Sequence, residues 1–141
     1  MAKTGPILIL EDDLDDQEIL ADVFAQLGIS NELKFFQKAD DVLTYLRSTS
    51  ETPFLILTDI NLPGMSGLEL RQEIFNDDHL RKKNIPYIFL STSDAGGYLD
   101  KAYEMQVQGF FKKESTYEAV KKQIRQIVDY WKNCLYPDSL T

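Results

Sequence analysis

Five short apolar runs, separated by stretches with helical periodicity, constrain the fold of this chain more than any other feature of its sequence. The runs cover residues 7–10, 33–36, 54–57, 87–90 and 109–111. Short apolar runs bounded by polar residues are typical of strands that are buried on both faces of a sheet. Strands that alternate with helices favour a parallel sheet with helices on both sides, because parallel neighbours need a crossover connection.

Apolar residues at helical spacing predict five helices. The first has Leu20, Val23, Phe24 and Leu27 on one face and stops at Gly28, and the second repeats the spacing with Ala39, Val42, Leu43 and Leu46. Weaker patterns cover 67–75 and 94–107, the latter with Gly96 and Gly97 in its first turn. The last helix has a stripe of Val120, Ile124, Ile127, Val128 and Trp131, with Ser115 as its cap and Pro137 beyond its end. The first four helices separate the five predicted strands from one another, and the last helix follows the fifth strand.

The predicted elements indicate an α/β fold with a doubly wound, five-stranded parallel sheet. Lys34 interrupts the second strand, as is typical of a strand at an edge, so we predict the strand order 2-1-3-4-5 of flavodoxin-like proteins. At 141 residues the chain has the size of one ordinary domain. We therefore expect a single domain over 1–141, with a core of about 6–135 and a short C-terminal tail.

The composition argues against several classes of partner. The formal net charge of -8 opposes binding to nucleic acid and to anionic membranes, which need a basic surface. The only cysteine, Cys134, forms no internal disulfide, and no apolar stretch is long enough for a signal peptide or a membrane span. We expect a cytoplasmic chain with protein partners.

Acidic residues follow the first and third predicted strands where these strands end. Glu11, Asp12 and Asp13 follow the first strand, and Asp59 and Asn61 follow the third. In open parallel sheets the functional crevice lies beyond the carboxyl ends of the strands, at the point where the strand order reverses. Carboxylates crowded there repel one another unless a cation binds among them, and oxygen ligands with room for water suit Mg²⁺ or Mn²⁺.

Donors to an anion follow the fourth and fifth strands. Ser91 and Thr92 end the fourth strand and Lys113 follows the fifth. A carboxylate beside a metal, a lysine and a hydroxyl suits phosphoryl transfer, with Asp59 as the nucleophile. Gly64 and Gly67 are interpreted as turn residues that lead the chain past this aspartate.

Other polar residues near these segments are assigned no part in the chemistry. We interpret Asp13, Asp15 and Asp16 as a solvated helix start, and the lone histidine, His79, is assigned no role.

Two segments of the chain resemble the receiver domain of two-component response regulators, and the likeness covers nearly the whole sequence. They are Ile-Leu-Ile-Leu-Glu-Asp-Asp at 7–13 and Leu-Thr-Asp-Ile-Asn-Leu-Pro-Gly-Met-Ser-Gly at 57–67. The chain looks like a stand-alone regulator of the chemotaxis type. The Glu-Asp-Asp start and the stretch at 76–84 also look similar to small regulators paired with phytochrome-type kinases.

The resemblance implies a role for each site residue. It implies that Asp12 holds the metal directly, Glu11 holds it through water, and Asn61 contributes its backbone carbonyl. It further implies that Ser91 is the switch hydroxyl, that Lys113 pairs with the phosphoryl group, and that Phe110 is the aromatic residue that repositions. The chain departs from the family at Glu114, where a proline usually follows the lysine, and at Phe110, which lacks a hydroxyl group.

The resemblance implies a phosphorylation-dependent signalling switch and not an enzyme, apart from phosphotransfer to Asp59 itself and autodephosphorylation there. Its expected partners are a sensor histidine kinase or phosphotransfer protein and a downstream protein. A homodimer through the face of helix 94–107, strand 109–111 and the last helix is also expected, whereas nucleic acid and membrane are not.

Three other functions of the same fold are weighed against this one. A flavin carrier needs a Ser/Thr/Gly-rich loop after the first strand, where this chain has acids. A phosphohydrolase with an aspartate nucleophile usually has a second acid two residues on, where this chain has Asn61. An interaction module that is never phosphorylated would not need the intact acidic pocket.

Overall fold

Five parallel strands form the central sheet of the computed structural model, which describes residues 2–60, 62–91 and 98–136. The strands are β1 (Ile7–Leu10), β2 (Leu33–Phe36), β3 (Leu55–Thr58), β4 (Tyr87–Ser91) and β5 (Gly109–Lys112). Their order is β2-β1-β3-β4-β5, and every neighbouring pair is parallel. The predicted fold class and strand order are confirmed, and β2, which contains Lys34, lies at an edge.

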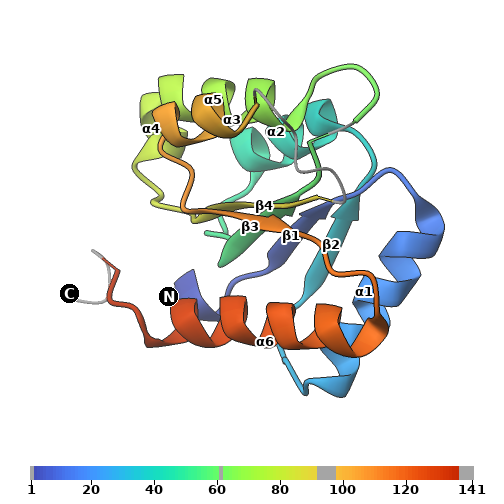
Figure 1. Cartoon of the computed structure of the whole chain (residues 1–141). Helices are drawn as coiled ribbons and strands as arrows, with labels where there is room; N and C mark the ends of the chain where they lie inside the picture. The colour runs from blue at the N-terminus through green and yellow to red at the C-terminus, as the bar shows by residue number, and fades with distance from the viewer. Residues whose placement is uncertain (1, 61, 92–97, 137–141) are drawn as a thin grey trace.

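Helices cover both faces of the sheet (Figure 1). They are α1 (Leu14–Gln26), α2 (Ala39–Ser48), α3 (Gly67–Asn76), α4 (Asp78–Arg81), α5 (Tyr98–Glu104) and α6 (Tyr117–Asn133), and a 3-10 turn (Ala2–Thr4) precedes β1. Figure 1 shows α1 and α6 on one face and the other helices on the opposite face. Alternate residues of β1 point to different layers: Ile7 and Ile9 pack with α1 and α6, whereas Leu8 and Leu10 pack with the other layer. Burial on both faces explains the continuous apolar runs of the strands.

Caps and one glycine set the ends of the helices beside the strand ends. Asp13 caps α1 by accepting hydrogen bonds from the backbone N–H groups of Asp15 (2.8 Å) and Asp16 (3.3 Å). Ser66 and Glu69 form a reciprocal capping box at the start of α3. Gly64, with φ +73°, makes the turn between β3 and α3, as the sequence predicts.

Four details differ from the expectations. The strand predicted at 54–57 is β3 at Leu55–Thr58, and Thr116, not Ser115, caps α6 by accepting from the N–H of Ala119. The short helix α4 was not predicted because a single turn with one buried side chain, Leu80, has no periodic pattern. Of the helix predicted at 94–107, α5 covers Tyr98–Glu104, while Gly96 and Gly97 lie outside the described residues.

Within the part of the chain that the structure describes, none of the helices combines the length and the hydrophobicity needed to cross a bilayer.

Candidate functional site

The candidate site lies where the carboxyl ends of β1, β3, β4 and β5 meet. Glu11 and Asp12 follow β1, Asp59 follows β3, and Ser91 ends β4. A backbone hydrogen bond of 3.2 Å from Asp59 N–H to the Leu10 carbonyl joins the ends of β1 and β3. The structure therefore brings together residues that lie far apart in the sequence, as the strand order predicts.

Among the described residues, two donors hold the carboxylate of Asp59. Its Oδ1 atom accepts a hydrogen bond from the hydroxyl of Ser91 at 2.7 Å and another from the N–H of Ile60 at 2.7 Å. The side chain of Ser91 is completely buried, so its hydroxyl is fixed where β4 ends. The predicted proximity of Ser91 and Asp59 is confirmed.

Two residues contact the backbone carbonyl of Asp59. From the sequence, Thr58 is assigned no role and Gly67 is interpreted as a turn residue. The hydroxyl of Thr58 donates to the Asp59 carbonyl at 2.8 Å. Gly67 is not the turn residue expected: it begins α3 and packs so tightly that a Cβ atom there would lie 2.7 Å from the Asp59 carbonyl oxygen and 2.7 Å from the ring of Phe89. Close packing under the Asp59 loop therefore explains this glycine.

Replacing Gly67 with alanine should lower the free energy of unfolding by about 1–3 kcal/mol, because the new methyl group forces the Asp59 loop or Phe89 to move. Urea unfolding measures this loss. Gly64→Asn is the matched control, since nothing lies within 4 Å of a Cβ there and asparagine tolerates positive φ. A Gly67→Ala protein as stable as the wild type would contradict the close packing.

Glu11 is a buried carboxyl group beside other acids. Burial raises its pKa from an ordinary 4.5 to about 7, and the charges of Asp59 and Asp16 act in the same direction. Its Oε2 atom accepts one hydrogen bond, from the N–H of Asp13 at 3.1 Å, which opposes the rise. A cation beside Glu11 would offset both the cost of burying its negative charge and the repulsion from the neighbouring carboxylates.

The raised pKa of Glu11 should make the stability of the folded protein depend on pH. Because the pKa of Glu11 is higher in the folded chain, its contribution to stability is fully present below about pH 4.5 and is lost as the pH rises through about 7. Thermal unfolding of the metal-free protein measures the loss, and Glu11→Gln should flatten the profile over this range. An identical profile in Glu11→Gln would show that another group causes it.

Asp12 lies at the mouth of the site. Its side chain is exposed, and its backbone carbonyl accepts a hydrogen bond from the side-chain amide of Gln37 at 3.2 Å. Among the described residues, no group of three or more acidic, histidine or cysteine side chains is gathered as a complete metal site. A site with few direct carboxylate ligands suits Mg²⁺, because this ion is usually bound by one or two carboxylates and keeps several waters. Asn61, the predicted carbonyl ligand, lies outside the described residues.

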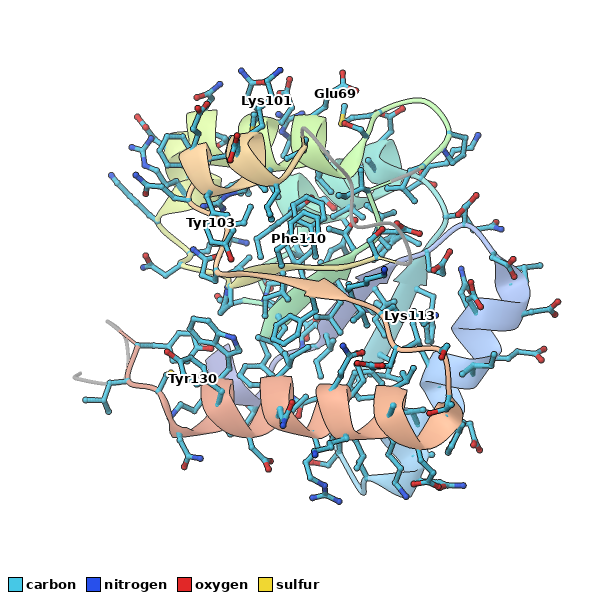
Figure 2. All side chains as sticks on the ribbon, viewed as in Figure 1. Glu69, Lys101, Tyr103, Phe110, Lys113 and Tyr130 are labelled. Atoms are coloured by element: carbon cyan, nitrogen blue, oxygen red, sulfur yellow. The ribbon has the colours of Figure 1, made fainter. Side chains whose placement is uncertain are left out.

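Lys113 approaches the site from β5 (Figure 2). Its backbone N–H donates to the Ser91 carbonyl at 2.7 Å, which ties it to the end of β4. Its side chain is only 10% exposed, and its ammonium group lies 3.8 Å from the carboxylate of Asp16 on α1. Glu11, Asp59 and Lys113 line the same small cavity, of about 10 Å³. The peptide bond that joins Lys113 to Glu114 is trans.

The remaining predicted residues lie elsewhere or are not described. Phe110 is half-buried in β5, and its ring packs 5.2 Å from that of Phe89, centroid to centroid. Thr92 lies outside the described residues. Asp16, interpreted as part of a helix start, is also the charge partner of Lys113, and no pattern in the sequence indicates this contact.

Comparisons with known proteins give matches that cover most of the chain. The family model of the response regulator receiver domain matches residues 7–125. The chain is 29% identical to chemotaxis protein CheY-3 of Vibrio cholerae, over 90% of this chain and 94% of the relative. It is 28% identical to response regulator Rcp1 of Synechocystis sp., over 89% of this chain and 87% of the relative.

Solved structures of response regulators also superpose on most of the chain. The phosphorylated cyanobacterial phytochrome response regulator RcpA superposes with a TM-score of 0.83 at 25% identity, covering 94% of this chain and 97% of that one. The Mn²⁺-bound form of response regulator Rcp1 superposes with a TM-score of 0.80 at 26% identity, covering 93% and 96%.

Proposed function

The chain belongs to the response regulator receiver domain family, and on that premise we propose that it is a signalling switch that accepts a phosphoryl group on Asp59. The family implies phosphorylation-dependent signalling by proteins that are generally phosphoacceptors and not catalysts. One observation carries the assignment of the acceptor: Asp59, Ser91, Lys113 and Glu11 meet at the carboxyl ends of four strands.

The transfer proceeds by attack of an Asp59 carboxylate oxygen on the phosphorus atom of a phosphohistidine. The new O–P bond forms as the P–N bond of the donor breaks, and the bonding electron pair returns to the imidazole ring. Lys113 and Ser91 donate to the oxygens of the transferred group, whose charge is the main obstacle to transfer. Hydrolysis of the resulting acyl phosphate resets the switch.

Glu11, Asp12, Asp59 and the backbone carbonyl of Asn61 would hold a divalent cation, Mg²⁺ or Mn²⁺. When bound, this ion neutralises charge on the carboxylates and the transferred group. The raised pKa of Glu11 supports the proposal, because an uncompensated carboxyl there is unfavourable. The Mn²⁺-bound form of the similar Rcp1 supports it independently.

Intact-protein mass after incubation with acetyl phosphate tests this function. We expect a gain of one phosphoryl group that requires Mg²⁺ and disappears with EDTA. A gain that is equal with and without metal would contradict the metal site, and no gain under any condition would favour an interaction module that is not phosphorylated.

The partners follow from the same proposal. A sensor histidine kinase or phosphotransfer protein supplies the phosphoryl group, and a downstream protein reads the altered surface or receives the group in a relay. Nucleic acid and membranes are not proposed as partners, because the net charge of -8 opposes them. We further propose a single domain over 1–141, with its core at about 6–135, and a cytoplasmic location, as predicted from the sequence.

The face built from α5, β5 and α6 is proposed as a homodimer interface. Tyr103 on α5 and Tyr130 on α6 are 58% and 63% exposed, and a groove of about 470 Å³ lies between these helices along β5. Figure 2 shows Tyr103, Phe110 and Tyr130 along this side of the molecule. Exposed aromatic side chains around a groove are typical of interfaces.

Replacing both Tyr103 and Tyr130 with serine should weaken a dimer of the phosphorylated protein at least roughly tenfold. Sedimentation velocity over a concentration series measures the effect, with Ile19→Ser, at an exposed apolar position on α1, as the control. Equal dimer affinities for the double variant and the wild type would exclude this face.

A further inference from the structure

The charge partner of Lys113 in the described structure is not the proposed phosphoacceptor. The ammonium group lies 3.8 Å from Asp16, and within the described residues Lys113 forms no ion pair with Asp59. Because Lys113 is only 10% exposed, its charge is largely removed from water and depends on a nearby carboxylate. Asp16 supplies that carboxylate.

Lys113 can change partners without moving its backbone. The hydrogen bond from its N–H to the Ser91 carbonyl holds the main chain at the end of β4. Its side chain lines the small cavity that Asp59 also lines. Rotation of this side chain alone would therefore transfer the ammonium group from Asp16 to a phosphoryl group on Asp59.

Asp16 is set apart from the neighbouring acid on the same helix turn. Its side chain is 35% exposed and faces Lys113, whereas Asp15 is exposed and forms no ion pair among the described residues. Both residues lie in the first turn of α1 and carry the same charge. The structure thus offers a pair of residues that differ in their contact with Lys113.

We propose that Asp16 is a positioning residue that holds Lys113 in the unphosphorylated protein and competes with the phosphoryl group for it. This inference rests on the proposed function of Asp59. Because the Asp16–Lys113 pair must break before Lys113 can stabilise the transferred group, Asp16 slows phosphorylation. It sets how readily the switch turns on, and it does so through Lys113.

Phosphorylation kinetics of Asp16→Asn test the proposal. We expect this variant to be phosphorylated by acetyl phosphate roughly threefold to tenfold faster than the wild type, at saturating Mg²⁺ and a donor concentration below saturation. Intact-protein mass against time gives the rates. Asp15→Asn, which removes an equal charge from the same helix turn, should stay within about twofold of the wild type. Equal acceleration in the two variants would overturn the proposal.

A double-mutant cycle separates competition for Lys113 from a general effect of charge or folding. In a Lys113→Met background, the further change Asp16→Asn should leave the phosphorylation rate unchanged, because the residue through which Asp16 acts is gone. Full acceleration in that background would overturn the proposal. A wild-type protein that gains no phosphoryl group would instead refute the proposed function, so the two failures can be distinguished.

Discussion

Replacing Asp59 with asparagine should abolish phosphorylation, lowering the rate by more than about a hundredfold. The amide oxygen of asparagine can still accept the hydrogen bonds that Ser91 and Ile60 donate to Oδ1, so we expect the fold to survive. The amide is a poor nucleophile for phosphorus and cannot form a stable acyl phosphate. Intact-protein mass after incubation with acetyl phosphate and Mg²⁺ measures the loss.

A control for the lost charge is available on α6, where Asp129 is exposed, whereas the acids of the site follow β1 and β3. Asp129→Asn should gain a phosphoryl group as the wild type does. If Asp59→Asn gained the group at the wild-type rate, another residue would be the acceptor, and the assignment of Asp59 would be wrong.

Replacing Lys113 with methionine should slow phosphorylation by roughly 10²- to 10³-fold, the usual effect of removing one donor that stabilises developing charge. Methionine keeps most of the length and apolar character of the lysine stem, so the packing of this largely buried side chain changes little. The main loss is therefore the positive charge beside the transferred group. Rates from intact-protein mass, at several donor concentrations, measure it.

Lys122→Met serves as the control for Lys113→Met, because Lys122 is exposed on α6. It should leave the rate within about twofold of the wild type. A Lys113→Met protein that is phosphorylated as fast as Lys122→Met would show that Lys113 does not stabilise the transferred group.

The fold was predictable because its signals are local. Strands buried on both faces are apolar along most of their length, and β1, β3 and β4 meet that requirement, with Thr58 and Ser91 as the polar last residues of β3 and β4. The interruption by Lys34 indicated that β2 is an edge strand, and the predicted order 2-1-3-4-5 satisfies that placement. The topology then placed the acids of β1 and β3 together before any distance was known.

Features that depend on tertiary contacts were not predictable. The glycine at position 67 looks like a turn signal, but a side chain is excluded there because the carbonyl oxygen of Asp59 packs against it. Asp16 has the sequence context of a solvated helix start, and only the packing of α1 beside the end of β5 brings it to Lys113. The burial that raises the pKa of Glu11 is likewise a property of the assembled layers.

Local competition explains the smaller errors. Ser115 and Thr116 are both good helix caps, and the chain uses the hydroxyl that reaches the N–H of Ala119. The roles of the site residues in phosphoryl transfer all stay predictions; these residues are Glu11, Asp12, Asp59, Asn61, Ser91, Thr92, Phe110 and Lys113.

The position of the phosphoryl group on the chain tests the central claim most directly. After brief phosphorylation by acetyl phosphate with Mg²⁺, borohydride reduces an aspartyl phosphate to homoserine, and peptide mass spectrometry then identifies the reduced residue. We predict homoserine at position 59 alone. Reduction at Glu11, Asp12 or any other acidic residue, with Asp59 unchanged, would contradict the proposed switch.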